Sequence, residues 1–72
     1  MDLGRIKVFH TLVKAGSFTK AARILKVSQP AVTHSLQLFE HSVKSKLINR
    51  STRGFTLTPE GERVFDLAER II

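Results

Sequence analysis

Residues 15–39 carry the strongest structural signal in the chain and read AGSFTKAARILKVSQPAVTHSLQLF. Two amphipathic patterns follow one another here, and each begins at a serine that can accept a hydrogen bond from the amides of a first helical turn. The first pattern predicts a helix over about 18–25, capped by Ser17. The second predicts a helix over about 28–42, capped by Ser28, with Pro30 in its first turn. Because only Lys26 and Val27 separate them, the two patterns predict a helix-turn-helix.

The second of these helices has two contrasting faces. Apolar residues at spacings of four, three and four form a stripe that we expect to be buried, namely Val32, Leu36, Phe39 and Val43. Four polar residues lie on the opposite face: Gln29, Thr33, His34 and Gln37. Their side chains can form hydrogen bonds with base edges in a DNA groove. In the first turn of the preceding helix, Thr19 and Lys20 are placed where amides and a cation could meet a phosphate.

The flanking sequence completes a small helical domain. Apolar residues at helical spacing predict a first helix over 2–14, ended by Gly16, and its inner face is Leu3, Ile6, Phe9, Leu12 and Val13. Residues 47–57 contain two short extended runs around a polar turn, which predicts a β-hairpin, or wing. Arg50 and Arg53 lie in this hairpin, where arginine suits a narrow minor groove or a phosphate.

A fourth helix is predicted to begin at Pro59, because Thr58 can cap it and proline fits a first helical position. Its apolar face is expected to pair with a partner chain and consists of Val64, Phe65, Ala68, Ile71 and Ile72. The pattern is still running at Ile72, so we expect the chain to be cut from something longer. The predicted fold is mainly α: a winged helix-turn-helix domain over 1–58, with a three-helix core and a small β-hairpin wing, followed by the start of a linker helix over 59–72.

Size and charge fit a domain that binds a polyanion. The chain has 72 residues, enough for one small domain, and a net charge of +6. Between residues 3 and 59 ten basic residues stand against one acid, Glu40, so this region carries +9. Such a surface favours nucleic acid by counterion release, although the charge alone would also fit a generic basic domain. No apolar run approaches a membrane span and no signal-peptide pattern is present, so we expect a cytoplasmic protein without a membrane partner.

Several chemistries are disfavoured by the sequence. The absence of cysteine excludes disulfides, thiol nucleophiles and cysteine-based zinc sites. His34 and His41 are two helical turns apart, about 10 Å, so they cannot share one metal ion. No serine or threonine shows an arranged base and third group, and no carboxylate pair is placed as in a cleft. We therefore expect neither an enzyme, nor a metal site, nor a cofactor.

Several strings in the chain resemble the N-terminal domain of the LysR-type bacterial transcriptional regulators. They are MDL at residues 1–3, GSFTKAA at 16–22, VSQPAVT at 27–33, and LTPEG at 57–61, together with Glu40, Leu47 and Arg50. The resemblance covers essentially all 72 residues, and the pairing of GSFT with SQPA at this separation is a specific signal, whereas either string alone would be weak.

The resemblance implies a bacterial regulator that binds double-stranded DNA at an inverted repeat as a homodimer, with tetramers in the full-length protein. It places the helix of about 28–42 in the major groove and the wing of about 47–57 on the backbone or the minor groove. Together with the residue patterns, it gives the candidate DNA-binding residues Thr19, Lys20, Ser28, Gln29, Pro30, Thr33, His34, Gln37, Arg50 and Arg53. A small-molecule effector is expected only through a ligand-sensing C-terminal domain that this sequence lacks, and the protein is expected at the bacterial nucleoid.

Four departures from the family pattern bear on these expectations. His34 stands where arginine is common, which weakens a charged contact or makes it pH-sensitive. Lys44 stands where a glycine usually ends the helix, so either a strained left-handed residue or a different turn is expected. Leu38 replaces a common basic residue and is expected to be exposed, and Ile48 replaces a usual phenylalanine.

The alternative function is a winged-helix protein-interaction module, which the polar face beside a basic surface disfavours.

Overall fold

The computed structural model describes residues 2–72. The element order is α1 (Leu3–Ala15), α2 (Phe18–Leu25), α3 (Gln29–Val43), β1 (Ile48–Ser51), β2 (Gly54–Leu57) and α4 (Pro59–Ile71). The two strands pair antiparallel, with Ile48 opposite Leu57 and Ser51 opposite Gly54. The predicted fold class, a three-helix core with a hairpin wing and a fourth helix, is confirmed.

Side-chain caps set the beginnings of the helices. Ser17, Ser28 and Thr58 each accept a hydrogen bond from an amide of the following first turn, at 2.9–3.1 Å. Helix α2 has the predicted bounds, whereas α1 and α3 each lie one residue further along than expected. The reason is the same in both cases: Asp2 and Ser28 have extended backbones and act as caps outside the helix.

Two lysines adopt the left-handed conformation at helix ends. Lys44 follows α3 with φ 56°, which settles the choice left open by the sequence in favour of the left-handed residue. Lys26 does the same after α2, with φ 59°, and this allows the short turn into α3. A residue with a Cβ is strained in this region of backbone space, so both turns are held at some conformational cost.

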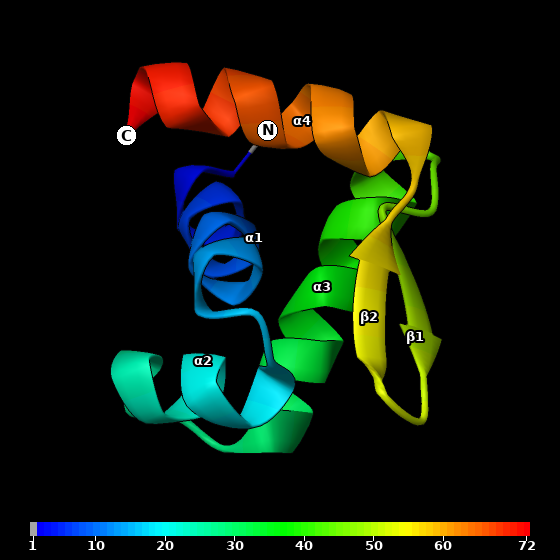
Figure 1. Cartoon of the computed structure of the whole chain (residues 1–72). Helices are drawn as coiled ribbons and strands as arrows, with labels where there is room; N and C mark the ends of the chain where they lie inside the picture. The colour runs from blue at the N-terminus through cyan, green and yellow to red at the C-terminus, as the bar shows by residue number, and fades with distance from the viewer. Residues whose placement is uncertain (1) are drawn as a thin grey trace.

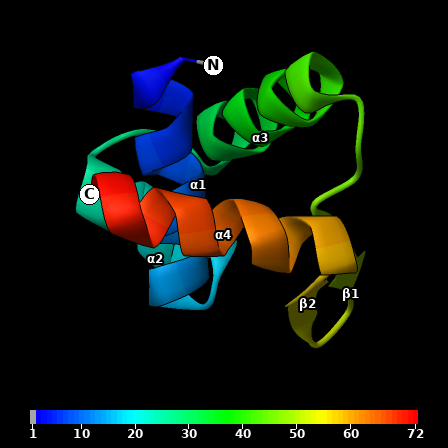
Figure 2. The same cartoon turned by 90° about the horizontal axis from the view of Figure 1, so that it is seen from above.

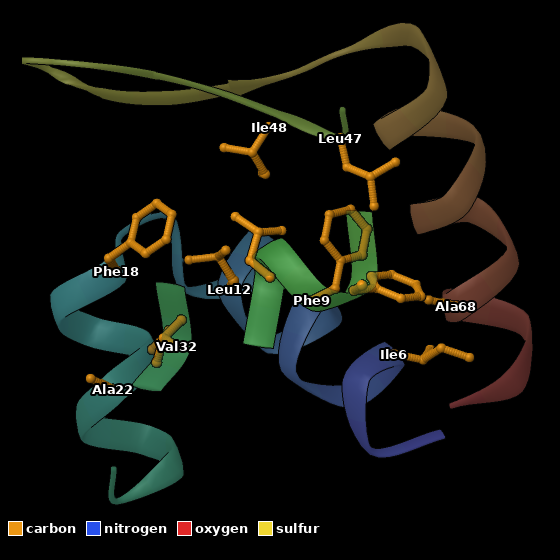
Figure 3. Packing of buried hydrophobic residues seen from close by; sticks show 12 residues of the cluster. Ile6, Phe9, Leu12, Phe18, Ala22, Val32, Leu47, Ile48 and Ala68 are labelled. Atoms are coloured by element: carbon orange, nitrogen blue, oxygen red, sulfur yellow. The ribbon is translucent and has the colours of Figure 1, made fainter. Parts of the chain in front are cut away.

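The core lies between all four helices and the hairpin (Figure 3). Phe9 and Leu12 of α1 are at its centre, and Phe9 packs against Phe39 with ring centroids 5.7 Å apart. The predicted stripe on α3 is confirmed, since Val32, Leu36 and Phe39 are buried and Val43 is half-buried. Leu3 was expected on the inner face of α1 but is 56% exposed, because it lies in the first turn of α1, where the core ends.

The molecule has two distinct ends (Figure 1), and in the view from above α4 passes in front of α1 and α2 (Figure 2). Helix α4 lies across one end, and α2, the first turns of α3 and the hairpin turn lie together at the opposite end (Figure 1). The start of α4 is fixed to the base of the wing, where the Thr58 amide and hydroxyl donate to the carbonyls of Leu47 and Lys46 at 3.0 and 2.6 Å. None of the helices in residues 2–72 combines the length and apolarity needed to cross a membrane.

Candidate nucleic-acid interface

The polar face predicted on α3 is accessible in the folded chain. Gln29, Pro30, His34 and Gln37 are exposed, and Thr33 is half-buried beside them. Because Val32, Leu36 and Phe39 anchor the opposite side of the helix in the core, this face must point outward. One side of α3 therefore anchors the helix in the core and the other is exposed, as is required of a helix that enters a DNA groove. Ser28 stands at the same end, and its hydroxyl caps α3.

The first turn of α2 contacts the first residue of α3 through side chains. The Gln29 amide donates from Nε2 to Thr19 Oγ1 at 2.6 Å. This bond holds the amide plane of Gln29, and it leaves the Oε1 acceptor and the second N–H of Nε2 without a partner in the described part of the chain. One acceptor and one donor side by side match the major-groove edge of adenine. Lys20 is exposed beside Thr19.

The wing touches the same region through Arg50. Its guanidinium carbon lies 3.7 Å from the centroid of the Phe18 ring, and Nη1 donates to Thr33 Oγ1 at 3.3 Å. Phe18 in turn meets Phe55 edge to face, with centroids 5.7 Å apart. One cluster therefore joins α2, α3 and both strands of the hairpin.

Arg53 has a different setting. It lies in the two-residue turn between β1 and β2, is exposed, and forms no ion pair with any residue from 2 to 72. Its guanidinium is therefore available to an external anion. Its backbone amide donates to Ser51 Oγ at 3.3 Å, which fixes the base of the turn.

Acidic side chains are kept away from this end of the molecule. Four of the six acids are in α4 and a fifth, Asp2, precedes α1. The sixth is Glu40, whose Oε2 accepts hydrogen bonds from the backbone amides of Leu47 and Ile48 at 2.7 and 3.2 Å. The one carboxylate between residues 3 and 59 is thus engaged with the entry to the wing, and the end that carries Gln29 and Arg53 presents basic and neutral groups.

A second polar cluster joins α1 to α4. His10 Nε2 lies 2.6 Å from Glu69 Oε2, and the His10 ring stacks on Phe65 with centroids 5.3 Å apart. The hydrogen bond to His10 lowers the pKa of the Glu69 carboxyl below its ordinary value. This cluster joins α4 to α1, and α4 lies at the end of the molecule opposite α2 and the first turns of α3 (Figure 1). Within residues 2–72 no three His, Cys, Asp or Glu side chains gather closely enough to hold a metal ion.

The apolar residues predicted to face a partner chain do not share one environment. Ile71 and Ile72 are 58% and 53% exposed, whereas Val64 and Phe65 are half-buried against the core. Ala68 is buried in the core of its own chain, 1% exposed, so it is not available to a partner. An apolar groove of about 310 Å³ runs between α1 and α4 and is lined by Leu3, Ile6, Val64, Leu67, Ala68 and Ile71.

Three contacts of the site were not predicted. Sequence patterns marked Thr19, Gln29, Thr33 and Arg50 as separate surface residues and did not show that they bond in pairs across elements. The role of Glu40 was signalled by its being the one acid in a basic region, but a single charge does not reveal the amides that it meets. A further feature, the left-handed backbone of Lys26, was not indicated by the sequence, because lysine is not typical of that conformation.

This arrangement defines a winged helix-turn-helix domain in which α3 presents a polar face beside a basic wing. A family model described as the bacterial regulatory helix-turn-helix protein, lysR family, matches residues 3–62. The chain is 39% identical over 72 residues to the HTH-type transcriptional regulator YofA of Bacillus velezensis and 38% identical over 72 residues to GltR of Bacillus subtilis. These matches cover all of this chain and 25% and 24% of the relatives, so the chain spans about a quarter of their length.

Solved structures agree. The CbnR DNA-binding domain in its complex with DNA superposes with a TM-score of 0.93 at 37% identity, over 99% of this chain and 82% of that one. The BenM DNA-binding domain bound to the benA site 1 DNA gives a TM-score of 0.92 at 32% identity, over 99% and 80% of the two chains. The chain therefore belongs to the LysR family of bacterial helix-turn-helix regulators, and its fold is that of their DNA-binding domains. The family predicted from the sequence is confirmed.

Proposed function

We propose that this chain binds double-stranded DNA in a sequence-specific manner, with α3 in the major groove and the wing on the adjacent backbone or minor groove. The observation that carries the proposal is the exposed polar face of α3, which lies at the same end of the molecule as the wing tip and away from the acids of α4. The two DNA-bound relatives of the same fold support it.

The residues of the interface divide into two roles. Those that face the base edges are Gln29, Pro30, Thr33, His34 and Gln37. Those placed for the sugar-phosphate backbone or the minor groove are Thr19, Lys20, Ser28, Arg50 and Arg53. Contacts of the first kind specify sequence, and contacts of the second kind supply affinity that falls with salt.

We further propose that the domain acts as a symmetric dimer on an inverted repeat, since two-fold protein symmetry requires a two-fold site. The exposed apolar residues Ile71 and Ile72, with Val64 and Phe65 behind them, continue the linker helix toward a partner chain. In the longer regulator we expect tetramers and a ligand-sensing domain through which a small-molecule effector acts. The target of the regulator is then the bacterial chromosome, so we expect the protein in the cytoplasm at the nucleoid.

A protein-interaction module is the second candidate, because the groove between α1 and α4 is apolar and open. It accounts for α4 but not for the polar face of α3 or the acid-free surface around it. The same groove is equally satisfied by a second copy of the chain, so the observations favour the DNA-binding function.

Selection of bound sequences from a random duplex pool tests the proposal. We expect an enriched half-site that occurs as an inverted repeat, and no enrichment over the starting pool would overturn the proposal. Gln29→Ala is expected to weaken binding to the selected duplex by about 1–3 kcal/mol and to relax base preference. Equal weakening on random DNA would remove Gln29 from base reading.

The wing is tested with a matched pair of arginine variants. Arg53→Ala is expected to weaken binding to all duplexes evenly and to lower the slope of log K against log salt by about one unit. Arg70→Ala removes an exposed arginine from α4, at the other end of the molecule, and is expected to leave the slope unchanged. If both variants change the slope equally, the wing has no special role.

A further inference from the structure

Arg50 is exposed, but its guanidinium contacts other side chains of the protein's own surface. Its guanidinium carbon lies over the Phe18 ring, 3.7 Å from the centroid, and Nη1 donates to Thr33 Oγ1 at 3.3 Å. Phe55 packs against Phe18 edge to face. A cation over an aromatic ring is an attractive arrangement, so the stack directs the guanidinium toward α3.

The bond to Thr33 has only one possible direction. A guanidinium has five N–H donors and no acceptor, so the Thr33 oxygen accepts and its own proton must point elsewhere. Threonine in a helix often donates to the carbonyl one turn earlier, yet among residues 2–72 the side-chain bond found for the half-buried Thr33 hydroxyl is the one it accepts from Arg50. Its proton is therefore not used within the described residues.

We propose that Arg50 is a positioning residue that fixes the Thr33 hydroxyl as a hydrogen-bond donor toward the DNA. A hydroxyl normally donates or accepts as its surroundings require, so threonine alone discriminates poorly among bases. Arg50 occupies one of the two lone pairs of the Thr33 oxygen, and its positive charge disfavours a second N–H donor there, so Thr33 prefers an acceptor on the major-groove edge. Where the hydroxyl meets the exocyclic group on purine C6 or pyrimidine C4, guanine (O6) or thymine (O4) is then favoured over adenine and cytosine, which present amino groups at that atom, whereas the N7 acceptor is shared by both purines. This inference rests on the proposed DNA-binding function and deepens it.

The arrangement requires arginine and not merely a positive charge. Lysine keeps the charge that a phosphate contact needs, but it lacks the planar group that stacks on Phe18 and aims a donor at Thr33. Arg50→Lys therefore separates positioning from charge. Thr33→Val removes the hydroxyl while keeping the side-chain shape, so it removes the group on which Arg50 acts.

The experiment measures binding of four proteins to the selected duplex and to duplexes in which each half-site base pair is replaced in turn. The proteins are the unmodified chain, Arg50→Lys, Thr33→Val and the double variant. For the unmodified chain we expect one position with a preference of about 5-fold or more for guanine or thymine. Arg50→Lys is expected to lose that preference while keeping the salt slope, and to have no further effect on preference in the Thr33→Val background.

Arg53→Lys is the matched control, because it changes an arginine of the same hairpin that has no stack. It is expected to leave the preference at that position intact. If Arg50→Lys keeps the preference, or if it changes preference equally with and without the Thr33 hydroxyl, the positioning role is overturned. Thermal unfolding of each variant verifies that the domain is folded.

A measurement without DNA separates this inference from the proposed function. In the free protein, nuclear magnetic resonance is expected to show guanidinium protons of Arg50, but not of Arg53, shifted by the ring current of Phe18. If the unmodified chain binds DNA without sequence selectivity, the proposed function is overturned. Selective binding together with unshifted Arg50 protons would overturn the positioning role alone.

Discussion

Gly61→Ala is expected to destabilise the domain, although glycine-to-alanine changes within helices usually stabilise. Gly61 lies in the first turn of α4, directly against the backbone that enters the wing. A Cβ built there would lie 2.1 Å from the Leu47 carbonyl oxygen and 3.0 Å from its carbonyl carbon. Ordinary contact begins near 3.4 Å, so α4 and residue 47 would have to separate by roughly 1 Å.

The size of the effect follows from what that separation disturbs. Overpacking of this kind costs about 1–3 kcal/mol. The Leu47 carbonyl also accepts from the Thr58 amide, and the neighbouring Lys46 carbonyl accepts from the Thr58 hydroxyl, so two hydrogen bonds worth about 1 kcal/mol each are strained. The better helix propensity of alanine offsets about 1 kcal/mol. The net loss is roughly 2 kcal/mol, which lowers Tm by about 8–16 °C in a domain of this size.

The assay is thermal or urea unfolding followed by circular dichroism, with Gly4→Ala as the matched control. Gly4 also lies in a first helical turn, but its Cβ would meet only the end of the flexible Asp2 side chain, at 3.3 Å. Gly4→Ala is expected to stay within about 1 kcal/mol of the parent chain. Equal unfolding midpoints for the two variants would refute the close approach between α4 and the wing.

Other predictions address the remaining local features. Glu40→Ala is expected to lower the free energy of unfolding by about 1.5–3 kcal/mol, because it leaves two backbone amides without their carboxylate. The control Glu62→Ala should change this free energy little. Equal losses for the two variants in urea unfolding would contradict the prediction. Lys44→Gly is expected to raise the free energy of unfolding by up to about 1 kcal/mol by relieving a left-handed residue, and a decrease would show that the turn is not strained. The lowered pKa of Glu69 contributes stability that is complete above its ordinary value of 4.5 and is lost as the pH falls through the lower folded value. The difference in stability between the parent and Glu69→Gln should therefore shrink below about pH 4.5, and a constant difference in unfolding midpoints from pH 7 to pH 3 would count against the His10 bond.

Much of the fold could be predicted because it depends on local signals. Ser17, Ser28 and Thr58 cap the helices that they were expected to cap, and the spacing of Val32, Leu36 and Phe39 indicated the buried side of α3. These features are properties of a few neighbouring residues, so they are readable without the tertiary structure. The bounds of α1 and α3 differed by one residue because a cap residue stands outside its helix.

Features that depend on contacts between distant residues could not be predicted. Periodicity placed Ala68 on the apolar side of α4 but did not show that the core of its own chain buries it. It placed Leu3 inward, although Leu3 stays exposed at the rim of the groove between α1 and α4. From the sequence, Arg50 is expected to be a surface cation. Its contacts with Phe18 of α2 and Thr33 of α3 exist only because the fold brings these elements together. Pairing across elements requires the fold, and the sequence alone offers no spacing rule for it.

The departures from the family pattern leave the fold intact. Leu38 is exposed, as expected, at 38%, and Ile48 is buried in place of the family's usual phenylalanine. His34 is exposed on the polar face of α3, so its effect falls on the interface and not on stability. These substitutions therefore bear on affinity and base preference within a conserved architecture.

Site-directed crosslinking tests the placement of α3 most directly. The chain has no cysteine, so a single one can be introduced at Gln37 on the polar face or at Asp66 on α4. Each variant is mixed with the selected duplex carrying a thiol tether on a base in the major groove. We predict a disulfide-linked complex for Gln37→Cys and none for Asp66→Cys. Crosslinking through residue 66 but not residue 37 would mean that the opposite end of the molecule meets the DNA, and the account would be wrong.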